Sequence, residues 1–276
     1  MKNIVKRSIS GIIYIALISS SIVLSPYSYA LLFAIVTGLS LWEFYSLLEK
    51  NGASRIDKVV ATLGGVFLFL SGFFWFAGLL PIKYISLWFI IMIYLFIREL
   101  YTKEEHAIRD IAYTFLGQVY IALPFMFLSR LGFLNPEIGT GDYSPILLMS
   151  FFALIWVSDT GAYVVGITFG KHRLFERISP KKSWEGFFGG VGFAVLASIV
   201  ISKVFPGYLN IYQWIGFSLV TVIFGTWGDL VESMIKRSLG IKDSGNIIPG
   251  HGGMLDRFDS TIFAAPAIVI YYLFLH

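Results

Sequence analysis

The sequence contains no cysteine, which excludes disulfide bonds, thiolate metal sites and a cysteine nucleophile. Charge is also scarce, because only 14% of the 276 residues are Asp, Glu, Lys or Arg. No long polar segment interrupts the chain, which excludes a sizeable soluble domain. Internal repeats are absent, and so are the inverted pairs of broken helices that are typical of many transporters.

Hydrophobic residues, by contrast, are abundant. They make up 57% of the chain, which includes 26 Phe, 15 Tyr and 7 Trp. A soluble domain cannot bury this much apolar surface, so the composition predicts a polytopic helical membrane protein. The runs lack the short alternation of transmembrane strands, so we expect an all-α fold. Nine runs approach the length of a membrane-spanning helix, at about 8–24, 28–48, 59–80, 84–100, 111–132, 145–169, 185–205, 213–237 and 259–275.

The distribution of Lys and Arg predicts the orientation. With the N-terminus on the cytoplasmic side, 18 of the 21 cations fall on that side, and only Lys83, Arg130 and Lys203 fall on the other. Cytoplasmic loops of membrane proteins are enriched in Lys and Arg. We therefore expect a protein integral to the cell membrane, with loops 170–184 and 238–258 facing the cytoplasm.

The start of the chain has two interpretations. A basic beginning, an apolar run to Leu24 and the small-residue stretch ending at Ala30 are typical of a signal peptide. Another apolar run follows at once, so we expect residues 1–30 to be retained as a first span. Cleavage, the alternative, would leave the remaining topology unchanged.

The two halves differ in chemistry. Residues 1–132, with about five helices, read as a transmembrane scaffold. Glu43 and Glu99 lie near the ends of spans there, so we expect them at the membrane interface. Residues 145–276, with about four helices, carry the polar residues that suit catalysis.

The stretch from Gly228 to Asp259 concentrates charge in an apolar chain. Carboxylates are preferred ligands of Mg²⁺, and Lys and Arg neutralise phosphate oxygens. Glycines at 245, 250, 252 and 253 let a backbone approach a ligand closely. The alternative is a solvated loop between helices, but the whole set indicates phosphate chemistry with a metal. The charged residues are Asp229, Glu232, Lys236, Arg237, Lys242, Asp243, Asp256, Arg257 and Asp259.

Asp159 and the loop after it form a second polar region. Asp159 precedes Gly170 by 11 residues, which places it about 16 Å from that end of a helix. A carboxylate at this depth indicates a polar cavity, although a hydrogen bond to a neighbouring helix is the alternative. Ser183 is predicted to cap the next helix, so Lys181 and Lys182 lie beside a helix N-terminus that attracts anions. The loop cations could instead serve only topology and lipid headgroups.

Helical spacing suggests how these groups meet. Asp229, Ser233 and Lys236 are separated by four and three residues and share one face of a helix. Asp256 and Asp259 are three residues apart, near the start of the last helix. We expect these three carboxylates, Asp229, Asp256 and Asp259, to converge on one metal.

Three blocks of the sequence resemble phosphatidate cytidylyltransferases, also called CDP-diacylglycerol synthases. The longest runs from Ser233 to Asp259, and the others are 158–163 and 179–186, so the resemblance covers about 150–265. It implies transfer of CMP from CTP to phosphatidate, giving CDP-diacylglycerol and pyrophosphate in membrane phospholipid biosynthesis. CTP, phosphatidate and membrane lipid are then the partners, a nucleic acid is not, and a homodimer is implied by resemblance alone.

We assign roles on this basis. Mg²⁺ is expected at Asp229, Asp256 and Asp259, while Asp159 either contributes to a second cation site, such as one for K⁺, or orients the first. His251 serves either as a phosphate donor or to structure its loop. The expected catalytic residues are Asp229, Asp256, Lys236 and Arg237, and the expected substrate-binding residues are Lys181, Lys182, Ser233, Lys242, His251, Gly252, Gly253 and Arg257.

Three other functions share some of these features. A CDP-alcohol phosphotransferase would carry a D-G-x2-A-R type metal pattern, which this sequence lacks. A lipid or dolichol kinase that uses CTP is closer in charge pattern. An ion-coupled transporter would use Asp159 and Asp229 as relay groups, but it would not need the glycine-rich loop or the surrounding cations.

Overall fold

The computed structural model describes residues 2–50, 52, 55–102, 106–134, 142–245 and 252–275. The chain divides into two compact units. The first comprises Met1–Arg130 with Leu239–Phe258, and the second comprises Leu131–Ser238 with Asp259–His276. The predicted division into a scaffold, 1–132, and a catalytic region, 145–276, concerns function and stays a prediction. Each unit is described separately below.

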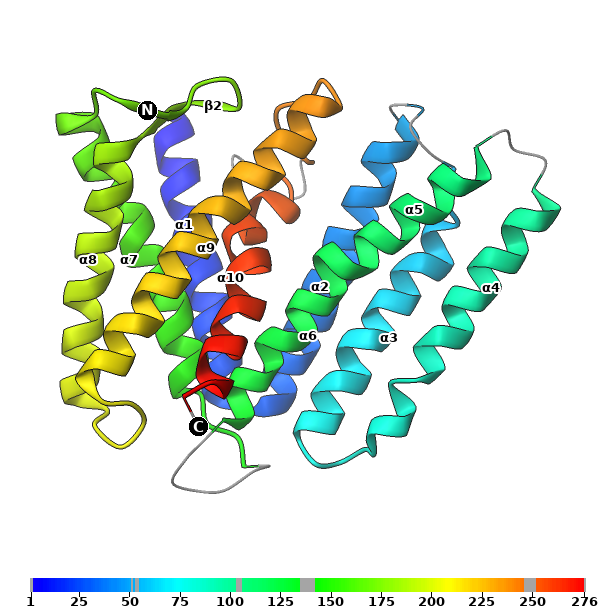
Figure 1. Cartoon of the computed structure of the whole chain (residues 1–276), viewed down its shortest axis with the longest axis horizontal. Coiled ribbons are helices and arrows are strands. Elements are labelled where there is room, and N and C mark those ends of the chain that lie inside the picture. Colours follow the sequence, from blue (N-terminus) through cyan, green and yellow to red (C-terminus); the bar gives the residue numbers. More distant parts are fainter. Residues whose placement is uncertain are drawn as a thin grey trace. The chain divides into compact units, whose positions relative to one another are not determined.

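The first unit is built from long helices and the loop segment that precedes the last helix (Figure 1). Pro26 occupies the first position of its helix, where its missing N–H has no cost. The side chain of Asp57 caps another helix by accepting a hydrogen bond from the Val60 N–H at 3.2 Å. The elements are α1 (Lys2–Leu24), α2 (Pro26–Lys50), α3 (Lys58–Phe76), η1 (Ile82–Tyr84), α4 (Leu87–Tyr101), α5 (Ala107–Gly117), the π-helical η2 (Gln118–Ala122) and α6 (Leu123–Arg130).

Aromatic packing fixes the first turn of the last helix, α10 (Leu255–Leu273), against these helices. Phe258 is buried, and its ring meets those of Phe33 and Phe125 edge to face, with centroids 5.8 and 5.5 Å away. Such contacts add to the free energy gained from burial alone. The Tyr14 hydroxyl also donates to the Arg257 carbonyl at 3.1 Å. Helices from the start of the chain thus hold the residues around position 258.

The second unit contains the remaining helices and a small hairpin (Figure 1). Its last helix, α10, begins at Leu255, so its first turn belongs to the first unit and the rest to this one. This start agrees with the expectation that Asp256 and Asp259 lie near a helix N-terminus. The elements are η3 (Leu131–Phe133), α7 (Ile146–Phe169), β1 (Arg173–Phe175), β2 (Ser179–Ser183), α8 (Trp184–Val204), α9 (Ile211–Ser238) and α10 (Leu255–Leu273).

Glycines let α7 and α8 pack closely. A Cβ on Gly189 would lie 2.5 Å from the Cβ of Val165, and one on Gly190 would lie 2.9 Å from the Ser158 carbonyl oxygen. Small residues of this kind let helix backbones approach closely. In lipid this close packing matters because no hydrophobic driving force holds the helices together. This packing sets the position of Asp159 on α7 relative to the start of α8.

The loop after α7 adds a feature to the expected all-α fold. The sequence argument excluded only membrane-spanning strands, and β1 and β2 form a short antiparallel pair within residues 170–184. The strands have only three and five residues, and the second, SPKKS, contains no large apolar residue, so neither shows a hydrophobic alternation. The pair shapes the basic loop directly before α8.

The helical membrane character is confirmed. Among the described residues, seven helices are long and apolar enough to cross a membrane, judged by length and composition. They are Pro26–Lys50, Lys58–Phe76, Ile82–Tyr101, Ala107–Phe133, Ile146–Phe169, Trp184–Val204 and Ile211–Ser238. The predicted run 8–24 lies within α1, and the run 259–275 is helical to Leu273 in α10, but neither is among these seven. The predicted total of nine spans stays a prediction.

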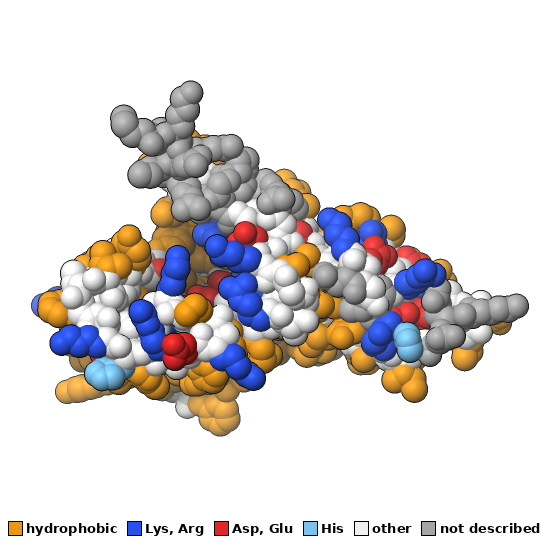
Figure 2. Space-filling model, turned by 90° about the horizontal axis from the view of Figure 1, so that it is seen from above, with side chains coloured by type: hydrophobic (Ala, Val, Ile, Leu, Met, Phe, Trp, Pro, Cys, Tyr) orange, Lys and Arg blue, Asp and Glu red, His pale blue; other side chains and the backbone are white. Residues whose placement is uncertain are grey.

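The surface fits this character. Large apolar side chains such as Phe89, Ile93 and Tyr94 of α4, and Leu196 and Val200 of α8, are exposed. Large exposed apolar surfaces mark contact with a membrane or with another protein. Figure 2 looks onto the end at which β2 and the end of α9 lie, where Lys and Arg are common and Asp and Glu lie among them.

Candidate active site

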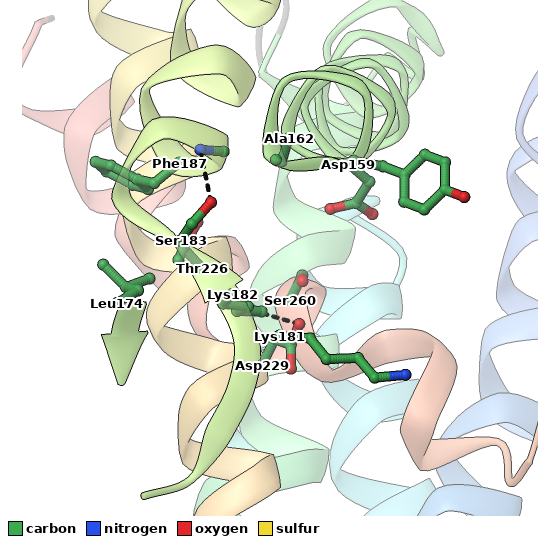
Figure 3. A pocket seen from close by; sticks show the side chains of 13 residues that line it. Asp159, Ala162, Leu174, Lys181, Lys182, Ser183, Phe187, Thr226, Asp229 and Ser260 are labelled. Atoms are coloured by element: carbon green, nitrogen blue, oxygen red, sulfur yellow. Dashed lines mark hydrogen bonds and ion pairs between the residues drawn. The ribbon is translucent and has the colours of Figure 1, made fainter. Parts of the chain in front are cut away.

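A cavity of about 290 Å³ lies in the second unit. Its walls come from α7, the hairpin, α8, α9 and α10, and Figure 3 shows the side chains that line it. Apolar groups, among them Leu174 and Phe187, form part of the wall. The polar lining residues are Asp159, Lys181, Lys182, Ser183, Thr226, Asp229 and Ser260.

An ion pair crosses this cavity. The Lys182 ammonium lies 2.5 Å from Oδ2 of Asp229, so β2 and α9 are joined at this point (Figure 3). The other oxygen of Asp229 accepts a hydrogen bond from the Ser233 hydroxyl at 3.3 Å. The predicted sharing of one helix face by Asp229 and Ser233 is therefore confirmed. Both charged side chains keep about a third of their surface exposed, at 28% and 32%, which leaves them open to a ligand.

Local structure holds the two lysines at the cavity. Ser183 caps α8, as predicted, by accepting a hydrogen bond from the Gly186 N–H at 3.1 Å. Glu185, in the first turn, accepts the backbone N–H groups of Lys171 and His172 and pairs with the His172 ring at 2.6 Å. Both ends of the loop are thus tied to the start of α8. A helix N-terminus favours anions, so this end of the cavity suits phosphate.

Two further carboxylates belong to this region. Asp159 lines the cavity from α7, and its side chain is directed into it in Figure 3. Asp259 interacts electrostatically with Asp229, Asp159 and Lys182. Mg²⁺ usually takes one or two carboxylates and completes its shell with substrate phosphates and water. Asp159 and Asp229 supply such donors, although no group of three or more His, Asp or Glu with the geometry of a metal site occurs in the described part of the chain.

Lys236 and Arg237, at the end of α9, lie beyond the residues that line the cavity. The Lys236 ammonium pairs with the carboxylate of Glu232, which is almost completely buried. A buried carboxylate needs such a partner. Arg237 is exposed. Their predicted catalytic roles stay predictions.

The other predicted residues belong to the first unit. Oδ2 of Asp256 accepts hydrogen bonds from the N–H groups of Ser244 and Gly253, at 2.9 and 2.8 Å. Gly252 has φ of 84°, and a Cβ there would lie 2.5 Å from the same oxygen. Asp256 therefore shapes its loop whatever else it binds. Its convergence with Asp229 on one metal stays a prediction.

Arg257, Lys242 and His251 complete the predicted set. Nε of Arg257 is buried and has no hydrogen-bond partner among the residues that the structure describes. Such a donor is costly unless a partner is bound, which fits the predicted contact with an anion. Lys242 is exposed. His251 lies outside the described residues.

Some residues of these sites were not predicted. Thr226 lies one helical turn before Asp229 on α9, and Ser260 directly follows Asp259. Helical spacing from Asp229 would have indicated Thr226, but Ser260 is adjacent to Asp259 and does not share its helix face. Glu43 on α2 and Ser244 in the loop before α10 had no such signal, because these two residues contact each other although they are 201 positions apart in the chain.

Comparisons with known proteins point in one direction. The profile described as the cytidylyltransferase family matches residues 5–275. A protein of Staphylococcus epidermidis strain ATCC 35984, named phosphatidate cytidylyltransferase, is 38% identical over 169 residues, which are 61% of this chain and 62% of that protein. A protein of the same name from Staphylococcus aureus strain COL is 37% identical over 169 residues, with the same coverage. The similarity thus spans less than two thirds of these relatives.

Proposed function

The chain belongs to the cytidylyltransferase family, and we propose that it transfers CMP from CTP to phosphatidate, giving CDP-diacylglycerol and pyrophosphate. The observation that carries this proposal is the cavity in which Lys182 and Asp229 form an ion pair beside Lys181 and Asp159. Cations and carboxylates in one recess suit a magnesium-bound triphosphate. The names of the relatives support the same reaction.

The reaction needs no protein nucleophile. An oxygen of the phosphatidate phosphate forms a bond to the α-phosphorus of CTP, while the bond from that phosphorus to the oxygen bridging to the β-phosphorus breaks. The electron pair of that bond leaves with pyrophosphate. The attacking oxygen is already anionic, so positioning and neutralisation of charge supply most of the catalysis.

The residues of the cavity have matching roles. Lys181 and Lys182 neutralise phosphate oxygens, and the N-terminus of α8 attracts the same anion. Asp229 and Asp159 would hold Mg²⁺, which neutralises phosphate charge and orients the leaving group when it is bound. Lys182 is shared between Asp229 and the substrate, so the ion pair keeps it in place before CTP arrives. Leu174 and Phe187 supply an apolar wall that suits a lipid substrate.

The finer topology belongs to the same proposal. We infer nine spans, with α1 and α10 added to the seven apolar helices, a cytoplasmic N-terminus and an active site that faces the cytoplasm. The 18 cations assigned to that side support this orientation. CTP is then supplied from the cytoplasm while phosphatidate keeps its acyl chains in the bilayer. A homodimer and a second cation such as K⁺ are further proposals that rest on family resemblance alone.

Purified protein in detergent, incubated with labelled CTP, phosphatidate and Mg²⁺, tests the reaction. We expect CDP-diacylglycerol and pyrophosphate in equal amounts. A lipid kinase using CTP would release CDP instead, and that result would replace our proposal. Absence of any product across varied lipids and metals would refute it. Arg130→Gln is a suitable control, because that guanidinium lies over the Phe76 ring, 5.2 Å from its centroid, and has no assigned role.

A further inference from the structure

Glu43 is a buried acid in an apolar helix. It lies on α2, and only 6% of its surface is exposed. The sequence suggested an interfacial position for it, which stays a prediction, while the structure shows that its side chain is buried within the first unit. A carboxylate is costly to bury unless hydrogen bonds compensate for lost hydration, so its contacts reveal its role.

Those contacts lead to the loop before α10. Oε2 of Glu43 accepts a hydrogen bond from the backbone N–H of Leu255 at 2.9 Å and lies 3.4 Å from the Ser244 hydroxyl. Leu255 is the first residue of α10, and the first N–H groups of a helix lack partners within it. Glu43 therefore caps α10 from a helix more than 200 residues away in the chain.

Gly245 and Gly253 also lie close to this carboxylate. A Cβ on Gly245 would lie 2.5 Å from Oε1 of Glu43, and one on Gly253 would lie 2.6 Å from Oε2. Oε1 itself is buried and has no hydrogen-bond partner in the described part of the chain. A Cβ on Gly253 would also clash with the Ser244 hydroxyl oxygen. Glu43 therefore explains glycine at 245, and Glu43 and Ser244 together explain glycine at 253.

Asp256 holds the same backbone from the other direction. Its Oδ2 accepts the N–H groups of Ser244 and Gly253, the two residues that flank the Glu43 carboxylate. Any shift of the loop away from Glu43 therefore moves the partners of Asp256. Phe258 cannot follow freely, because it is buried among Phe33 and Phe125.

We infer that Glu43 is a positioning residue that fixes the start of α10 and, through Ser244 and Gly253, the direction of the Asp256 carboxylate. The consequence for catalysis rests on the proposed function and on the predicted metal-binding role of Asp256. The consequence for loop structure does not. The two are therefore measured separately.

Hydrogen exchange of the intact protein tests the structural part. In Glu43→Ala we expect faster exchange in peptides covering 242–258, with other helices unchanged, because the Leu255 N–H loses its acceptor. Glu43→Gln keeps a carbonyl acceptor and should restore most of the protection. Unchanged exchange in Glu43→Ala would overturn the inference, even if the wild-type protein proved to have another activity.

Turnover tests the catalytic part. A lost buried hydrogen bond corresponds to a loss in kcat per folded molecule of about 10- to 100-fold for Glu43→Ala. Adding Glu43→Ala to Asp256→Asn should cost less than about threefold more, because both changes act through one carboxylate. The control is Glu99→Ala, which removes another buried acid of this unit, paired with Arg98 at 2.7 Å. Its kcat should stay within about twofold of wild type. Equal effects of the two Ala variants would overturn a positioning role for Glu43, whereas an inactive wild type would instead refute the proposed function.

Gly245 offers an independent check. Beyond Glu43, the nearest atom to a Cβ at this position is the Gly253 Cα, at an ordinary contact distance of 3.4 Å. Gly245→Ala alone should accelerate exchange in 242–258. In the Glu43→Ala background the same substitution should have no further effect, since the clashing carboxylate is gone. Additive effects would overturn the inference that Glu43 sets the loop position.

Discussion

Replacing Lys182 with Met separates a structural ion pair from a catalytic one. Met keeps much of the apolar length of lysine and removes the charge. Asp229 would lose the ammonium at 2.5 Å but keep the Ser233 hydroxyl at 3.3 Å. The substitution therefore tests the charge of Lys182 with little change in packing.

The effect on stability should be small. Two unit charges at 2.5 Å attract by about 1.7 kcal/mol at the dielectric constant of water and by about 6.6 kcal/mol at an effective value of about 20. Desolvation and loss of side-chain freedom offset most of this attraction. Side chains that are 28% and 32% exposed behave more like surface pairs, whose net contribution is up to about 1 kcal/mol. We expect Tm to fall by only about 2–4 °C.

The effect on turnover should be much larger. A charged donor aimed at negative charge in a transition state contributes about 2.7–4 kcal/mol, which corresponds to about 100- to 1,000-fold in kcat. The assay measures formation of CDP-diacylglycerol from labelled CTP, beside thermal unfolding of the same detergent-purified preparation. Lys171→Met is the matched control, because Lys171 belongs to the same loop but does not line the cavity. Its kcat should stay within about twofold of wild type.

Two outcomes would refute this reasoning. A rate for Lys182→Met close to that of wild type would show that the cavity is not the reaction site. A large loss of Tm with a proportional loss of activity would show that the ion pair is mainly structural. If Lys182 acts mainly in catalysis, its replacement should change Tm little and lower kcat by orders of magnitude.

Further predictions concern packing, metal and topology. Gly189→Ala should destabilise the α7–α8 contact by about 1–3 kcal/mol, because a Cβ there meets Val165, whereas Gly192→Ala, with open space around it, should not lower Tm. Chelation with EDTA should abolish turnover of the purified protein, and added Mg²⁺ should restore it; activity that persists after exhaustive chelation would refute the metal assignment. The absence of cysteine permits single-cysteine labelling, and a membrane-impermeant thiol reagent added outside intact cells should modify Lys83→Cys but not Arg55→Cys. The reverse pattern would show that the predicted orientation is wrong.

Local rules predicted several features correctly. Ser183 caps α8 because a hydroxyl at this position satisfies an N–H group only three residues away. Asp229 and Ser233 contact each other because four residues bring side chains to one helix face. Both interactions depend on spacing along a single segment, which the sequence displays directly. The expected placement of Asp159 at a polar cavity is also met.

Other features depend on contacts between distant segments. In the hairpin, Arg173–Phe175 is too short to show a hydrophobic period, and Ser179–Ser183 contains no large apolar residue. The ion pair between Lys182 and Asp229 joins two residues 47 positions apart, and only the fold determines which lysine of the pair at 181 and 182 reaches the carboxylate. Glu43 near the end of a span looks the same in sequence whether it meets water or a buried loop. Tertiary packing determines the hairpin, the ion-pair partner of Asp229 and the burial of Glu43.

The position of Glu43 also explains why a membrane helix in the N-terminal half carries a buried acid. Fixing the backbone of each loop residue costs about 1–2 kcal/mol of conformational entropy, and the glycines at 245, 252 and 253 increase this cost. Two carboxylates offset it. Glu43 accepts hydrogen bonds from Leu255 and Ser244, and Asp256 accepts them from Ser244 and Gly253. An apolar side chain at position 43 would be cheaper to bury but would leave the first N–H of α10 without its acceptor. The N-terminal helices therefore do more than anchor the chain in the membrane, because one of them fixes the loop that presents Asp256.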